Sequence, residues 1–408
     1  MSRYDGDAID HTSGGTRSAD REPPDGEPTV PPPAGAPTTA ASTTGAPTTG
    51  APTTGAPTAG TSLAGTSLAV GARERGLRRG RLFVALVVCL GVVLLLVLVS
   101  LGVGARSIPL ETVWRVLLRD DGSPEAIIVR RLRMPRTVLA VAVGAALALA
   151  GVVMQAITRN PLAEPGIVGV NSGASFAVVV AIAGFQVTSV SGYVWFAFAG
   201  AVLAALLVYT LTSGAARSHH HTRLVLAGAA LSASLGACTG ILTMFDTDAF
   251  DSYRFWVVGS LENRGTEALT AAVPFVVVGT LIALALGPSL NALALGDETG
   301  AALGLRVSWV RAAGFLSIML LCGASTAAAG PIAFVGLVVP HVLRLVLGPD
   351  LRRLLAFSLP GGAILLLVGD IAGRVIAPPG EIEVGIVTAF IGAPALLWLV
   401  VRRRAVSS

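Results

Sequence analysis

The sequence predicts an all-α integral membrane protein with about ten transmembrane helices, preceded by a disordered N-terminal tail. The first observation is composition, because 53% of the 408 residues are hydrophobic and only 13% are charged. Soluble domains carry about a quarter charged residues. The second observation is a series of long apolar runs from residue 82 onward. The third is that arginines gather at the ends of these runs, so the net charge of +5 does not indicate nucleic-acid binding.

Residues 1–72 have the composition of a disordered segment. They are rich in Pro, Thr, Ala and Gly, and the unit Gly-Ala-Pro-Thr recurs at Gly35, Gly45, Gly50 and Gly55. Such a segment buries too little apolar surface to offset the entropy of ordering it. It also lacks the charged-then-apolar layout of a cleavable signal peptide. We therefore expect a disordered cytoplasmic tail over 1–72 and a transmembrane domain over 73–404.

The first span sets the expected orientation. Residues 73–81 contain five arginines directly before the apolar run 82–104. About 20 apolar residues cross a membrane, and flanking positive charge marks the cytoplasmic side. An even number of spans then places both termini in the cytoplasm. The further spans are expected at 135–157, 166–185, 190–213, 222–245, 268–288, 311–330, 331–347, 351–372 and 384–401.

One arginine-rich segment does not fit this orientation. Residues 130–136 read RRLRMPR and fall on the expected outer face. They also precede a span, where the helix dipole disfavours cations. A segment that breaks two rules at once indicates a functional site.

Small residues indicate tight helix packing. Gly169 and Gly173 lie four apart, as do Gly236 and Gly240. This spacing lets helix backbones approach closely in a membrane. We expect both pairs to lie at helix contacts.

The chain carries no sign of catalytic or nucleotide chemistry of its own. All of its basic residues other than His are arginines, whereas a phosphate-binding P-loop requires a lysine. Cys89, Cys238 and Cys322 stand singly, without the spacing of a metal or redox site. No Ser/His/Asp set or paired acids suggest an enzyme. We expect no cofactor or metal on this chain, and any nucleotide energy must come from a partner.

Several long motifs resemble those of one family. The run 133–174, RMPRTVLAVAVGAALALAGVVMQAITRNPLAEPGIVGVNSGA, closely resembles the hallmark stretch of the FecCD-type permeases, which are the membrane subunits of ABC importers for iron–siderophores, haem and vitamin B12. Similar segments follow in the same order: FWVVGSL (255–261), LGDETGAALGLRV (295–307), GPIAFVGLVVPHVLRLVLGPDLRR (330–353), GDIAGR (369–374) and VGIVTAFIGAPALLWLV (384–400). The resemblance covers about 82–404.

This resemblance implies a type II ABC importer permease fold. It implies a second permease subunit, identical or related, within membrane lipid. It further implies separate cytoplasmic ATPase subunits that hold ATP and Mg, and an extracytoplasmic substrate-binding protein. A ferric siderophore is the expected substrate, with haem or vitamin B12 as alternatives. A secondary transporter driven by an ion gradient is less well supported, because the spans carry almost no ionisable groups near their centres.

The resemblance also implies a docking site for the binding protein at Arg133, Arg136 and Arg374. The first two are three apart and could project from one helical face. They could instead be interface anchors, and Arg374 could form an i,i+4 pair with Asp370. Glu383 stands where the family usually has Pro. Together with Glu381 it could pair with Arg374 and reduce its availability.

Two cytoplasmic elements complete the implied sites. The first is the loop 295–307, called here the coupling loop, in which Asp297, Glu298, Leu303 and Gly304 would contact the ATPase. Simple capping of a short helix would use the same acids. The second is RNPLAEPG at 159–166, called here the inner turn. Its Asn160, Pro161, Glu164 and Pro165 would form a gate near the inner mouth, although a plain tight turn would look the same.

Overall fold

The described residues of the computed structural model are 63–104, 106–187, 189–213, 220–378 and 380–407. Most of the stretch predicted as a tail, residues 1–62, lies outside them. The helix α1 (Leu63–Gly102) begins inside that stretch, earlier than the boundary at residue 73. The prediction of disorder over 1–62 therefore stays a prediction.

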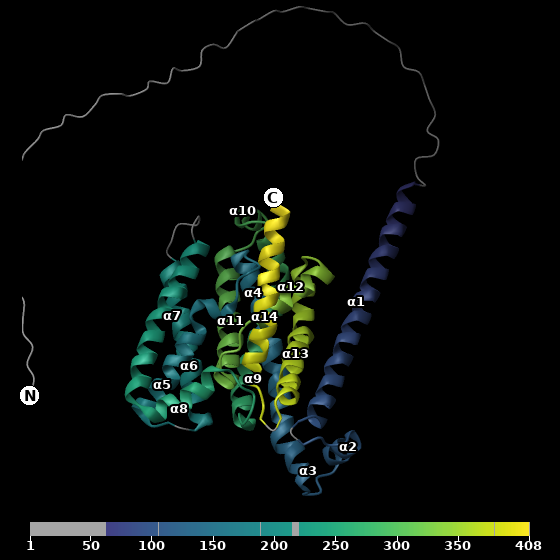
Figure 1. Cartoon of the computed structure of the whole chain (residues 1–408). Coiled ribbons are helices and arrows are strands. Elements are labelled where there is room, and N and C mark those ends of the chain that lie inside the picture. Colours follow the sequence, from purple (N-terminus) through teal and green to yellow (C-terminus); the bar gives the residue numbers. More distant parts are fainter. Residues whose placement is uncertain (1–62, 105, 188, 214–219, 379, 408) are drawn as a thin grey trace, which may run out of the picture. The chain divides into compact units, whose positions relative to one another are not determined.

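The described residues form helices and contain no strand. After α1 come α2 (Leu110–Leu118), α3 (Pro124–Ile127), the π-helical η1 (Ile128–Arg133), α4 (Met134–Thr158), the 3-10 turn η2 (Pro165–Val168), α5 (Val170–Phe185), α6 (Val190–Ser213), α7 (His220–Phe245) and α8 (Thr247–Val257). The second half holds α9 (Gly265–Ala294), α10 (Asp297–Ala302), α11 (Val307–Ala329), α12 (Val335–Leu347), α13 (Leu351–Ile376) and α14 (Val384–Ser407). Figure 1 labels these elements.

The apolar helices match the predicted spans. Among the described residues, seven helices are long and apolar enough to cross a membrane. They are Gly80–Gly102, Pro124–Thr158, Ser191–Thr212, Arg223–Phe245, Gly265–Ala294, Val307–Ala329 and Leu351–Ile376. Three shorter apolar helices, Val170–Phe185, Val335–Leu347 and Val384–Leu397, occupy the remaining predicted spans. The prediction of an all-α membrane protein is confirmed.

Helix α4 is the buried centre of the bundle and packs against α9, α11, α12 and α13 (Figure 1). Two glycine contacts make this packing close. A Cβ atom on Gly144 would overlap the carbonyl of Gly362 in α13, and one on Gly151 would overlap the carbonyl of Gly336 in α12. Backbones therefore touch directly, which is how small residues hold helices together in lipid.

The predicted glycine pairs behave differently from each other. Gly173 of α5 faces Gly200 of α6, and a Cβ on either would overlap the other's backbone. Gly236 and Gly240 of α7 have no atom within reach of a Cβ. The contact expected at this second pair is absent within the described part of the chain.

The long apolar stretch 311–347 is broken where Gly330 and Pro331 predicted. Gly330 has a φ of 77° and ends α11, its N–H bonding to the carbonyl of Thr326. Phe334 also has a positive φ, 69°, just before α12 begins. The N-terminus of α12 thus needs a hydrogen-bond acceptor from elsewhere in the bundle.

Candidate functional site

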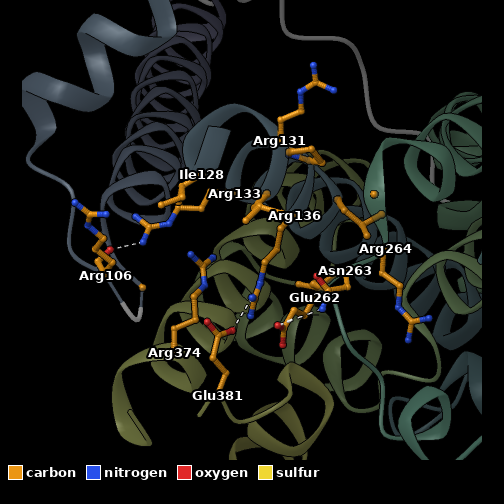
Figure 2. A pocket seen from close by; sticks show the side chains of 16 residues that line it. Arg106, Ile128, Arg131, Arg133, Arg136, Glu262, Asn263, Arg264, Arg374 and Glu381 are labelled. Carbon is orange, nitrogen blue, oxygen red and sulfur yellow. Dashed lines mark hydrogen bonds and ion pairs between the residues drawn. The ribbon is translucent and has the colours of Figure 1, made fainter. Parts of the chain in front are cut away.

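An arginine-lined cavity of about 420 Å³ opens beside η1, the start of α4 and the end of α13, and we call it the outer cavity (Figure 2). Its lining includes all three arginines that the resemblance assigned to docking. The lining residues are Gly104, Arg106, Ile128, Arg131, Leu132, Arg133, Pro135, Arg136, Leu139, Leu261, Glu262, Asn263, Arg264, Gly265, Arg374 and Glu381. The structure therefore brings Arg133, Arg136 and Arg374 together, although 238 residues separate the last two.

Arg133 is buried and serves the end of α1. Its Nη1 donates to the carbonyls of Leu101, at 2.8 Å, and Gly102, at 2.9 Å, and its Nη2 donates to the carbonyl of Arg106. The last carbonyls of a helix have no partner within the helix, and a cation there also matches the helix dipole. Arg133 is therefore a cap for α1 rather than a free surface charge.

Arg374 serves the same helix end from α13. Its Nη1 donates to the carbonyls of Ser100, at 2.8 Å, and Val103, at 3.0 Å. Its Nη2 donates to the Ser100 hydroxyl at 2.7 Å. The side chain also forms the i,i+4 pair with Asp370 that the alternative reading expected. Two guanidinium groups thus cap one helix terminus.

Arg136 is held by two carboxylates. Its Nε donates to Asp370 at 2.9 Å, and its Nη1 donates to Glu381 at 2.6 Å. Its side chain is 11% exposed, against 1% for Asp370 and 20% for Glu381. The sequence had suggested that Glu381 could pair with Arg374. In the structure Glu381 pairs with Arg136 instead.

The helix that carries these arginines changes geometry at η1, which ends at Arg133. In η1 the backbone bonds reach five residues back, as from the N–H of Met134 to the carbonyl of Val129. The extra residue per turn shifts every later side chain around the axis. Arg133 ends η1 and Arg136 lies in the first turn of α4, and both line the outer cavity although they bind different partners.

Arg131 is the arginine that sequence reasoning noted but did not single out. It is exposed, and within the described residues no hydrogen bond or ion pair is recorded for it. Figure 2 shows its guanidinium turned away from Arg133 and Arg136. Its neighbour Arg130 is engaged instead with the end of α2, where its Nε donates to the carbonyl of Val116 at 2.8 Å. Only tertiary contacts distinguish the two, so no sequence signal could have done so.

The acidic side of the outer cavity includes Glu262, in the loop between α8 and α9. Burial, together with the nearby Glu381, raises the pKa of the Glu262 carboxyl above its usual value. Arg264 contacts neutral groups instead of these acids. It donates to the carbonyl of Ser260 at 3.2 Å and to the Tyr193 hydroxyl at 3.0 Å. The outer cavity therefore contains both arginines and carboxylates. It can bind an anionic group only at an arginine whose guanidinium can donate to that group.

The coupling loop forms α10 and the turn after it. Asp297, at the first position of α10, accepts hydrogen bonds from Arg311 at 2.8 Å and from Arg159. The N-cap residue is Gly296, which has no side chain, and Asp297 and Glu298 lie in the first turn of α10, where the helix dipole favours acids, so the capping alternative stays open. The loop is also tied to α11 and to the end of α4.

The rest of the coupling loop faces outward. Glu298 is exposed and the side chain of Leu303 is 63% exposed. Gly304 has a φ of 84°, a conformation that other residues rarely adopt, and it turns the chain toward α11. An exposed leucine directly after a short helix that is held by ion pairs provides a surface for a partner.

The inner turn is more than a loop. The Asn160 side chain accepts from the N–H of Leu162 at 3.0 Å, which fixes the turn that contains Pro161. Pro165 begins η2 and lies against Gly336, at the first turn of α12. The sequence had predicted the breaks at both prolines.

Glu164 links the inner turn to the broken start of α12. Its carboxylate accepts the N–H of Phe334 at 2.6 Å, across 170 residues of sequence. Burial raises the pKa of this carboxyl, and the hydrogen bond opposes the shift. Gln155 donates to the Gly336 carbonyl at 3.2 Å beside it. Glu164 therefore supplies the acceptor that the N-terminus of α12 needs.

Comparison with known proteins now decides the family. The model of the FecCD transport family matches residues 92–402 of this chain. The chain belongs to the FecCD transport family. This FecCD protein is 43% identical over 316 residues to the ferric enterobactin transport system permease protein FepD of Escherichia coli K12, covering 77% of this chain and 94% of that one.

Another relative is named for a different transported compound. The hemin transport system permease protein HmuU of Yersinia pestis is 36% identical, over 76% of this chain and 94% of its own length. A solved structure described as an inward-facing conformation of a metal-chelate type ABC transporter superposes with a TM-score of 0.69 at 31% identity, covering 78% of this chain and 99% of that one. The FecCD protein is thus a multi-pass membrane protein of a transport family.

Proposed function

We propose that this FecCD protein is the permease subunit of an ABC importer that carries a ferric siderophore into the bacterial cytoplasm. The observation that carries the proposal is the coupling loop, where a short helix is fixed by ion pairs of Asp297 and presents Glu298 and Leu303 outward. A partner that closes on this surface would move α4 and α11 through Arg159 and Arg311. ATP and Mg would reside on that partner, because this chain has no P-loop lysine.

A second permease subunit is supported by α7. Gly236 and Gly240 are exposed and have open space before them. A small-xxx-small face without a neighbour in its own chain is suited to close approach by another transmembrane helix. We assign this face to contact with an identical or related subunit.

Cytoplasmic termini and an outward-facing outer cavity complete the topology. Arg159, Arg311 and the coupling loop then lie on the cytoplasmic side, in keeping with the positive-inside rule. An extracytoplasmic binding protein would deliver the chelate at the outer cavity. Ferric siderophore is preferred over haem because the ferric enterobactin relative is more similar to this chain than the hemin relative is.

Uptake in a strain that lacks this permease tests the proposal. The strain would be complemented with wild type or with Leu303→Glu, and supplied with radiolabelled ferric siderophore, haem or vitamin B12. We expect wild type to restore ferric siderophore uptake, and the charged variant to abolish it at an unchanged level of membrane protein. Uptake should stop on ATP depletion but survive a protonophore that leaves ATP intact.

The control is Leu118→Glu, a similarly exposed leucine at the end of α2, outside the coupling loop. If wild type restored the uptake of haem or vitamin B12 alone, that compound and not a ferric siderophore would be the substrate. Uptake that follows the ion gradient and ignores ATP would overturn the importer assignment in favour of a secondary transporter.

A further inference from the structure

We propose that Glu381 is an internal carboxylate that occupies Arg136 until an acidic side chain of a soluble partner protein displaces it. The choice of partner rests on the proposed function. The exchange itself rests on the geometry of the outer cavity.

The two carboxylates on Arg136 are not equivalent. Asp370 is almost wholly buried at 1% exposure and also pairs with Arg374, so it is fixed in the protein interior. Glu381 approaches from the cavity at 2.6 Å and is 20% exposed. Within the described residues, no hydrogen bond is recorded from the Nη2 atom of Arg136. A guanidinium receives carboxylates along its planar edges, and Glu381 occupies the edge that a visiting carboxylate would use.

The other docking arginines of the cavity are less suited to exchange. Arg133 and Arg374 are both buried and donate to backbone carbonyls at the end of α1. Those carbonyls carry no charge, and apart from Gly102, which also accepts from the N–H of Ile108 at 2.9 Å, they lie at a helix end where partners within the helix are missing. Withdrawing either arginine would therefore uncap a helix, whereas withdrawing Arg136 from Glu381 exchanges one carboxylate for another.

Electrostatics favours replacement over simple addition. The cavity already contains Glu381 and Glu262, and the raised pKa of Glu262 reflects both burial and the neighbouring carboxylate. A further carboxylate would be repelled by both. Arg131, exposed at the rim, provides the positive charge that attracts an acidic surface. The visitor is then drawn in by Arg131 and takes the place of Glu381.

The exchange at Glu381 would affect the connection between α13 and α14. It lies in the connection between α13 and α14, three residues before α14 begins at Val384. Its neighbour Ile382 donates its N–H to the carbonyl of Gly373 at 3.0 Å, and Gly385 donates to the carbonyl of Gly259 at 3.0 Å. Release of Glu381 removes the one side-chain ion pair recorded for this connection in the described residues. Docking outside would thereby loosen the start of a transmembrane helix.

Binding of a synthetic fluorescent oligoglutamate peptide to the purified full-length protein in lipid nanodiscs tests the proposal. Glu381→Gln removes the competing charge and keeps the side-chain volume. We expect it to bind the peptide about threefold to tenfold more tightly than wild type, in line with the worth of a partly exposed ion pair. Glu381→Asp, which keeps the charge, should stay near wild type.

The matched control is Glu383→Gln, which removes the same charge two residues away, where no ion pair is recorded within the described chain. Equal tightening in both glutamine variants would mean a general charge effect and would overturn the exchange. So would an unchanged affinity in Glu381→Gln. Adding Arg136→Gln to Glu381→Gln should remove the gain, and persistence of the gain would also refute the proposal.

The same thermal unfolding midpoint in each variant would exclude misfolding. Peptide binding needs neither an ATPase nor a chelate. A failure here would therefore leave the importer assignment untouched, and a failure of uptake would leave the exchange untouched.

Discussion

Asp370→Ala is expected to be strongly destabilising, because one buried carboxylate neutralises two arginines. Asp370 is 1% exposed and accepts from Arg136 at 2.9 Å and from Arg374. Removing one partner of a buried ion pair costs about 3–5 kcal/mol, because the remaining charge is left buried. Arg136 keeps Glu381 and Arg374 keeps Ser100. We therefore expect a loss near the lower end of that range, about 3 kcal/mol.

The comparison variant is Asp251→Ala. Asp251 pairs with Arg254 at 3.2 Å, with both side chains more than half exposed. Exposed pairs of this kind contribute about 0–1 kcal/mol. The two variants thus remove the same chemical group from opposite environments, and the difference in stability isolates burial.

The assay is unfolding of the purified protein in mixed detergent micelles with increasing SDS, followed by far-ultraviolet circular dichroism. Asp370→Ala should raise the unfolding equilibrium constant by more than about a hundredfold, and Asp251→Ala by less than about fivefold. If Asp370→Ala unfolds within about 1 kcal/mol of wild type, then the two arginines must find other partners or water, and the buried network is not what holds α4 to α13.

Two further predictions concern packing and pH. Gly151→Ala should abolish correctly folded protein in the membrane, because its Cβ would overlap the Gly336 carbonyl, whereas Gly91→Ala has open space and should be tolerated. Fluorescence-detected size-exclusion chromatography distinguishes the two variants. A monodisperse Gly151→Ala protein would refute the contact. The raised pKa of Glu262 disfavours its ionised form in the folded state, so its contribution to stability is fully present below the unfolded pKa and is lost as pH rises through the folded pKa. Glu262→Gln should therefore reduce the stability difference between about pH 4 and about pH 8, and an identical pH profile would contradict the assignment.

The spans were predictable from sequence because a membrane imposes a length and a polarity on every crossing helix. The break at Gly330 and Pro331 was predictable because a proline removes a backbone N–H and interrupts a helix wherever it stands. The family motifs also identified the residues that meet in the outer cavity. These features depend on short stretches of sequence, which are visible without a fold.

The partners of the charged residues were not predictable. Nothing local indicates that Arg133 and Arg374 both reach the end of α1, or that Glu164 accepts a hydrogen bond from Phe334. Each contact joins residues far apart in the chain. The π-helical η1 was a second feature that the sequence did not indicate, because the apolar and charged pattern of 128–133 does not differ from that of an ordinary helix.

The glycine contacts of α4 limit how this protein can move. A slide of α4 by one helical turn would bring Leu147 or Gln155, four residues from Gly151 on the same face, against the carbonyl of Gly336, where even a Cβ atom does not fit. Shear between packed helices is a common mode of domain motion, and a shear of that size is blocked here. Helices α4, α12 and α13 must therefore travel as one rigid body, so that alternating access depends on hinges at its borders.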